Sequence, residues 1–174
     1  MGNSLDDLES MVGRVQTALE QADYSSEMKG TADYLRVIHA EYFADETGPS
    51  GEKWTPWYFK RPGASADHKT LDDTGRLKES VIGTSSEHIE DISAKSLIWG
   101  TSVPYAWQHE IGGKFTVEEF LIGKRGQTKH PGDTINLPKR EFIGINTDHV
   151  DAIVGTIADA AQAVVLDAID GKGL

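Results

Sequence analysis

The sequence contains no cysteine and is poor in basic residues. The lack of cysteine excludes disulfides, thiolate zinc sites and a cysteine nucleophile. Seventeen Lys and Arg face 28 Asp and Glu, so the formal net charge is −11. Phosphate neutralisation requires clustered Lys and Arg. The composition therefore disfavours sequence-specific nucleic-acid binding.

Long apolar runs are also missing. The longest uninterrupted aliphatic run covers residues 163–166, whereas a membrane-spanning helix needs about 20 apolar residues. We therefore expect no membrane span. The length of 174 residues fits a single domain over residues 1–174. Acidic charge is concentrated at both ends, because residues 1–50 hold 10 acids and 3 bases and residues 147–174 hold 5 acids and 1 base.

Apolar periodicity predicts helices at both ends of the chain. Near the start, one stripe follows Ser4, the expected N-cap; it consists of Leu5, Leu8, Val12, Val15 and Leu19. Such a narrow stripe needs a partner surface to be stable. A second helix is predicted over 26–44, and we expect the two to form an antiparallel hairpin within residues 1–46. A long final helix is predicted from Thr147 or Asp148 to Gly171.

Shorter elements are predicted between these helices. A helix over 76–82 is expected to be capped by Asp73 or Thr74. A turn region is expected around 89–92, followed by a strand over 96–100. Pro104 opens a helix over 105–110, which ends at glycines 112 and 113. The pattern predicts an α+β fold with a small, mostly antiparallel sheet and a long C-terminal helix.

Residues 114–137, here called the arm, are predicted to form an extended hairpin. The arm carries five large apolar residues within eight positions and has a basic tip over 123–129. Exposing so much apolar surface is costly, so we expect the arm to contact another copy of the chain. The candidate subunit-interface residues are Phe115, Val117, Phe120, Leu121, Lys124 and Arg125. We expect the basic tip to dock on the acidic helices of the neighbouring copy.

The candidate chemical groups favour structural roles. His109 and Glu110 are adjacent, so on a helix they point about 100° apart rather than towards one ligand. The six histidines have no metal-ligand spacing, and neither a Gly-x-Ser-x-Gly motif nor a phosphate loop occurs. We therefore expect no enzyme, and no catalytic residue, cofactor or metal site. The alternative, an enzyme of a mobile element, requires clustered bases or metal ligands.

Four motifs nevertheless occur in order along the middle of the chain. They are Pro49-Ser-Gly-Glu-Lys-Trp54, Leu71-Asp-Asp-Thr-Gly-Arg-Leu77, Tyr105-Ala-Trp-Gln-His-Glu-Ile-Gly112 and Pro138-Lys-Arg-Glu-Phe-Ile-Gly144. In this the chain resembles the phage virion morphogenesis family, the tail completion proteins of contractile-tailed phages and prophages. The sequence departs from the family pattern around Arg140, where Lys139 and Glu141 stand at positions at which the family often has Ala and Pro.

The resemblance implies a non-enzymatic virion protein that completes the head-proximal tail end or the neck and joins it to the head. Related proteins form rings, so the expected partners are other copies of the chain in a hexameric ring. Further expected partners are the tail tube or tail terminator and the head-connector proteins. The implied location is the virion tail or neck, after assembly in the bacterial host cytoplasm. A head–tail connector, or head-completion protein, is the alternative within this class.

Overall fold

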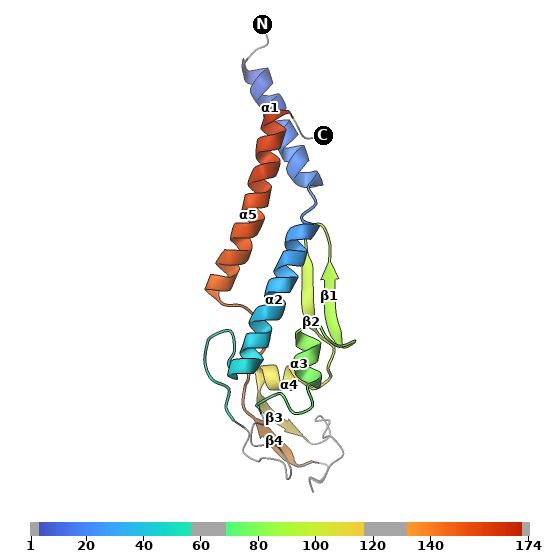
Figure 1. Cartoon of the computed structure of the whole chain (residues 1–174), viewed down its shortest axis with the longest axis vertical. Helices are drawn as coiled ribbons and strands as arrows, with labels where there is room; N and C mark the ends of the chain where they lie inside the picture. The colour runs from blue at the N-terminus through green and yellow to red at the C-terminus, as the bar shows by residue number, and fades with distance from the viewer. Residues whose placement is uncertain (1–3, 57–68, 117–131, 172–174) are drawn as a thin grey trace. The chain divides into compact units, whose positions relative to one another are not determined.

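The computed structural model describes residues 4–56, 69–116 and 132–171 of an α+β protein, the fold class expected from the sequence (Figure 1). The helices and strands follow in the order α1 (Ser4–Gln21), α2 (Ser25–Asp45), α3 (Arg76–Val81), β1 (His88–Ile92), β2 (Leu97–Thr101), α4 (Ala106–Ile111), β3 (Gly113–Thr116), β4 (Thr134–Leu137) and α5 (Thr147–Asp170). The predicted bounds of the long helices are accurate to within one or two residues.

The chain divides into two compact units. The helical unit contains residues 1–33, 91–98 and 147–174, and the motif unit contains residues 34–90 and 99–146. Helix α2 and both strands of the β1–β2 sheet contribute residues to each unit. All four motifs found in the sequence lie in the motif unit.

The helical unit is built on helices α1 and α5, which lie side by side and antiparallel (Figure 1). Arg14 Nε donates to the carbonyl oxygen of Ala168 at 3.4 Å. Lys95 Nζ donates to the carbonyls of Leu19, at 3.2 Å, and Glu20, at 2.6 Å, and so satisfies the negative end of α1. We expected α2 to cover the stripe of α1, but the helix that packs against α1 is α5.

The β1–β2 sheet corrects one prediction. The segment 89–92 was expected to be a turn, but it belongs to strand β1, which pairs with β2. The turn lies at 93–96 instead, where the Ser93 amide donates to the Ser96 carbonyl at 2.9 Å. The acidic pair Glu90–Asp91 obscured the strand because Glu and Asp are rare in strands.

Strands β3 and β4 form the base of the predicted arm. They pair antiparallel, from Gly113 opposite Leu137 to Thr116 opposite Thr134. The second strand of the predicted hairpin, expected to include residues 135 and 137, is therefore confirmed as β4. Residues 117–131 of the arm lie outside the described residues.

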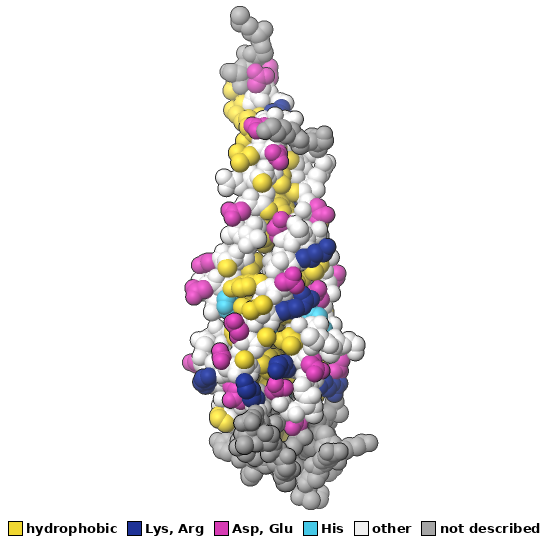
Figure 2. Space-filling view, viewed as in Figure 1, with side chains coloured by type: hydrophobic (Ala, Val, Ile, Leu, Met, Phe, Trp, Pro, Cys, Tyr) yellow, Lys and Arg dark blue, Asp and Glu magenta, His cyan; other side chains and the backbone are white. Residues whose placement is uncertain are grey.

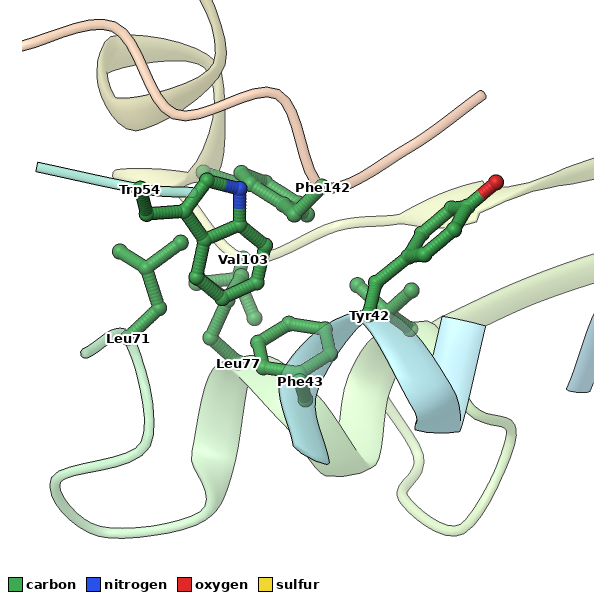
Figure 3. Packing of buried hydrophobic residues seen from close by; sticks show 9 residues of the cluster. Tyr42, Phe43, Trp54, Leu71, Leu77, Val103 and Phe142 are labelled. Atoms are coloured by element: carbon green, nitrogen blue, oxygen red, sulfur yellow. The ribbon is translucent and has the colours of Figure 1, made fainter. Parts of the chain in front are cut away.

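The core of the motif unit collects aromatic side chains from separate segments (Figure 3). Phe43 from α2 meets Trp54 in an edge-to-face arrangement, with ring centroids 5.4 Å apart. Phe142 lies 6.1 Å from Phe43. The other members of the core cluster are Tyr42, Leu71, Leu77, Val81, Val103 and Ala106.

The start of α3 differs from the expected cap. Asp73 and Thr74 were candidates, but the N-cap is Gly75, with φ of 80° and no side-chain cap hydrogen bond. That backbone conformation favours glycine, which has no Cβ to clash with the following carbonyl. Asp72 instead pairs with Lys78 at 3.0 Å.

Candidate functional site: a joint of four motifs and two exposed surfaces

The pair His109–Glu110 lies on α4 and points into the protein. Its aromatic neighbour is Tyr105, whose ring meets that of His109 edge to face at 6.1 Å. Glu110 Oε2 accepts the amide hydrogen of Phe142, at 2.9 Å, and that of Ile143, at 3.4 Å. The Glu110 carboxylate thus fixes the backbone of the fourth motif through these two hydrogen bonds.

Arg140 joins the same cluster from the other side. Its side chain is only 2% exposed, and its Nε donates to the carbonyl of Thr55 at 2.8 Å. Its backbone amide donates to the carbonyl of His109, also at 2.8 Å. Arg140 of the fourth motif therefore contacts the third motif and Thr55, the residue that follows the first motif.

Burial controls the protonation of these groups. It lowers the pKa of His109 to about 4, with the charge of Arg140 as a smaller contribution. Burial also raises the pKa of Glu110, against the opposing effect of the amides of Phe142 and Ile143. Burial lowers the pKa of Arg140. His109 is consequently neutral at pH 7.

Glycines allow the motif backbones to approach one another closely. A Cβ on Gly112 would lie 2.5 Å from the amide nitrogen of Lys139, and one on Gly48 would lie 2.5 Å from the carbonyl oxygen of Glu141. The indole Nε1 of Trp54 donates to that same carbonyl at 2.8 Å. The close contacts fix the third and first motifs against the fourth.

His39 adds a contact that the motifs do not reveal. Its Nδ1 lies 2.7 Å from the Leu35 carbonyl, and its Nε2 accepts from the amide of Gly144 at 3.3 Å. A donor Nδ1 and an acceptor Nε2 define a neutral tautomer. Sequence reasoning gave every histidine a structural role but had no signal for this pairing, because 105 residues separate the partners.

Four of these residues form one joint, here called the motif joint: Trp54, His109, Glu110 and Arg140. Leu77 of the second motif belongs to the core cluster that also contains Trp54 and Phe142. The polar atoms of the motif joint bind backbone groups of neighbouring motifs, which is the structural role expected for His109 and Glu110. Among the described residues, no group of three His, Asp or Glu side chains is placed to hold a metal ion.

The predicted subunit interface is described only at Phe115. This residue is buried in β3, where its ring meets that of Trp107 edge to face at 5.3 Å. Val117, Phe120, Leu121, Lys124 and Arg125 lie outside the described residues. The arm as an interface therefore stays a prediction, with Phe115 placed at its base.

Two exposed apolar surfaces escaped the sequence reasoning. On α4, Trp107 is 52% exposed, and Ile111 lies one turn further on the same face and is equally open. On the helical unit, large apolar side chains of both α1 and α5 are exposed (Figure 2). The spacing of these residues indicated helix faces, but spacing alone does not tell whether a face is covered.

Helix α5 is the one described helix that is long and apolar enough to cross a membrane, with a mean hydropathy of 1.6 over 18 residues. The run-length criterion missed it because single polar residues interrupt the apolar ones. Asp159 stands near the middle of this helix, where an aspartate costs about 2.5–3.5 kcal/mol on insertion scales. Helix α5 also packs along α1, although only 6% of this apolar stretch is buried within the described structure.

The four motifs thus build a scaffold. The exposed surface of the helical unit lies outside it, whereas Trp107 and Ile111 belong to the third motif. The chain belongs to the phage virion morphogenesis family, whose sequence model it matches over residues 4–162. The family is one of phage structural and morphogenesis proteins. No curated protein and no solved structure is similar enough to the chain to match it.

Proposed function

We propose that the protein completes the head-proximal end of a phage tail, or the neck, as a ring of identical subunits that joins the tail to the head. Family membership supports a role in virion morphogenesis. The ring at the tail end or neck is supported by one observation: the arm begins in the chain directly next to the motif joint. Strand β3 begins at Gly113, one residue after the close contact between Gly112 and Lys139.

A ring requires a heterologous contact, in which one patch of a subunit meets a different patch of the next. The arm supplies one such patch, since its residues 117–129 combine apolar and basic side chains. Virion location and assembly in the host cytoplasm follow from this role, as do contacts with tail-tube or terminator and head-connector proteins. The role requires no catalytic step, cofactor, membrane or sequence-specific nucleic acid.

The assembly proposal is tested by replacing residues 116–135 with a short Gly-Ser linker. The intact chain is expected to form a closed ring, with a hexamer as the expected size, by native mass spectrometry. The shortened chain is expected to stay folded and monomeric, because the motif joint does not use these residues. An unchanged oligomer would show that the arm is not the assembly element.

The location is tested by electron microscopy of particles that carry a labelled copy of the chain. Label at the head-proximal tail end of isolated tails supports the tail-completion role. Label that stays on tailless heads instead identifies a head–tail connector. Tails that lack the protein are expected to have complete tubes but to fail to join heads when mixed with them.

A further inference from the structure

The apolar stripe of α1 continues beyond the helix that covers it. Leu5, Leu8 and Val12 follow the i, i+3, i+7 spacing of one helix face and are 67%, 50% and 56% exposed. Arg14 meets Ala168 close to the C-terminal end of α5. Because the helices are antiparallel and rise 1.5 Å per residue, α5 ends about where Val12 begins to be exposed. The first two turns of α1 therefore lack a cover within the described chain.

Helix α5 adds to this apolar surface. Val150, Val154, Leu166 and Ile169 are each more than a third exposed. Apolar side chains run along this part of the molecule with acidic groups among them and few basic ones (Figure 2). Together, the exposed apolar residues of α1 and α5 are here called the helical face.

The charge around the helical face has one sign. Helix α1 carries four acids and one base, Arg14, and α5 carries five acids and no Lys or Arg. The two helices thus hold nine acids against one base, a net charge of −8. Two helical faces would repel each other, and so would a helical face and an anionic lipid surface. The partner that fits is apolar in its centre and basic at its rim.

We propose that the helical face receives the arm of a second copy of this chain. Residues 117–122 contain Val117, Phe120, Leu121 and Ile122 together with two acids, Glu118 and Glu119. Residues 124–129 add three bases, Lys124, Arg125 and Lys129, so that the positive charge is confined to the tip. The apolar residues and the basic tip of this segment complement the exposed apolar and acidic side chains of the helical face. The contact is heterologous, because the arm and the helical face are different patches, and such contacts build a ring when the rotation between neighbouring subunits closes. The inference rests on the proposed ring function and names the surface that accepts the arm.

Two variants test the proposal: one lacks the arm, and the other lacks the apolar residues of α1 in the helical face. The first lacks the arm, with residues 116–135 replaced by the Gly-Ser linker. The second carries Leu5→Ser, Leu8→Ser and Val12→Ser, which leaves every charge in place. Each variant alone is expected to be monomeric by analytical ultracentrifugation. Their mixture is expected to form a 1:1 heterodimer, because the arm of the second docks on the intact helical face of the first.

A synthetic peptide of residues 114–137 measures the same contact directly. Binding to the arm-deleted chain is expected to weaken at least tenfold when the triple substitution is added, and also when the salt is raised from 0.05 to 0.5 M. A peptide with Lys124, Arg125 and Lys129 changed to Glu is expected not to bind. Val37→Ser, at an exposed apolar position of α2 outside the helical face, is the matched control and leaves the affinity unchanged.

The possible failures are distinguishable. If the intact chain forms rings but the mixture yields no heterodimer, the helical face is not the acceptor, although the ring function stands. If the intact chain is monomeric at assembly concentrations, the proposed ring itself fails. Equal binding of the acidic peptide, or tighter binding of the arm-deleted chain to phosphatidylcholine–phosphatidylglycerol vesicles than to the peptide, overturns the proposal in favour of a non-specific apolar or membrane surface.

Discussion

The motif unit and the helical unit use apolar side chains in opposite ways. In the motif unit, Leu77, Val81 and Phe142 are almost wholly buried, and polar groups such as Arg140 are buried with them. In the helical unit, Leu8, Val12 and Val154 are at least half exposed. A protein core gains free energy from buried apolar area, and the motif unit forms such a core within one subunit, although Trp107 and Ile111 on α4 stay exposed. The helical unit retains apolar area that a neighbouring molecule can bury.

The largest expected difference in unfolding free energy comes from truncating a leucine to alanine in each unit. Leu77, only 3% exposed, loses about 2–5 kcal/mol of unfolding free energy on Leu77→Ala. Leu8→Ala, at a half-exposed site, changes it by less than about 0.5 kcal/mol in the monomer. Urea unfolding followed by tryptophan fluorescence and circular dichroism measures both. Equal losses would remove the distinction between the units.

Glycine-to-alanine substitutions are expected to have opposite signs in the two units. Gly112→Ala introduces a Cβ against the Lys139 backbone at a φ of 61°, so we expect a loss of about 2–4 kcal/mol from overpacking and backbone strain. Gly13→Ala, in α1 with nothing within 4 Å, is expected to gain up to about 1 kcal/mol from helix propensity. Thermal unfolding of both variants measures these changes in stability. Stabilisation by Gly112→Ala would contradict the close contact between Gly112 and the Lys139 backbone.

Acid is expected to weaken the motif unit through His109. The pKa of His109 in the folded protein, about 4, lies below the ordinary histidine value of 6.5, so the unfolded chain binds the proton first. The stabilising contribution of neutral His109 is therefore complete above about pH 6.5 and is lost as the pH falls towards 4, by up to about 3 kcal/mol. The raised pKa of Glu110 acts in the opposite direction, because its contribution falls as the pH rises.

The variant His109→Gln isolates this contribution. Its unfolding free energy is expected to vary less between pH 7 and pH 4.5 than that of the unaltered chain, and Glu110 affects both proteins in the same sense. Urea titrations at several pH values measure the difference. An identical pH dependence in the two proteins would show that His109 titrates alike in the folded and unfolded states.

Local pattern predicted the elements except strand β1, whereas their partners depended on contacts that no local pattern contains. The stripe from Leu5 to Leu19 correctly indicated a helix that needs a partner, but α5 rather than α2 supplies the packing. The cap of α3 was misassigned because Asp73 and Thr74 are good capping residues, whereas the decisive quantity is the positive φ of Gly75. At the motif joint, the types of His109 and Glu110 suggested structural roles. Their actual partners, Arg140 and Phe142, are about 30 residues away and became visible only with the fold.

The close approach of Gly112 to Lys139 gives the arm a mechanical property. A force that separates Thr116 from Thr134 acts on an antiparallel ladder from the end at which residues 117–133 join its strands, so that the hydrogen bonds break one pair at a time. Separation of the strands proceeds as far as the last pair, Gly113 and Leu137. Beyond this pair the chain is held by the hydrogen bond from the Arg140 amide to the His109 carbonyl, and by the close contact between the backbones of Gly112 and Lys139. Tension on the arm is thereby transmitted to the interior of the motif unit, where rupture requires several buried contacts to fail at once.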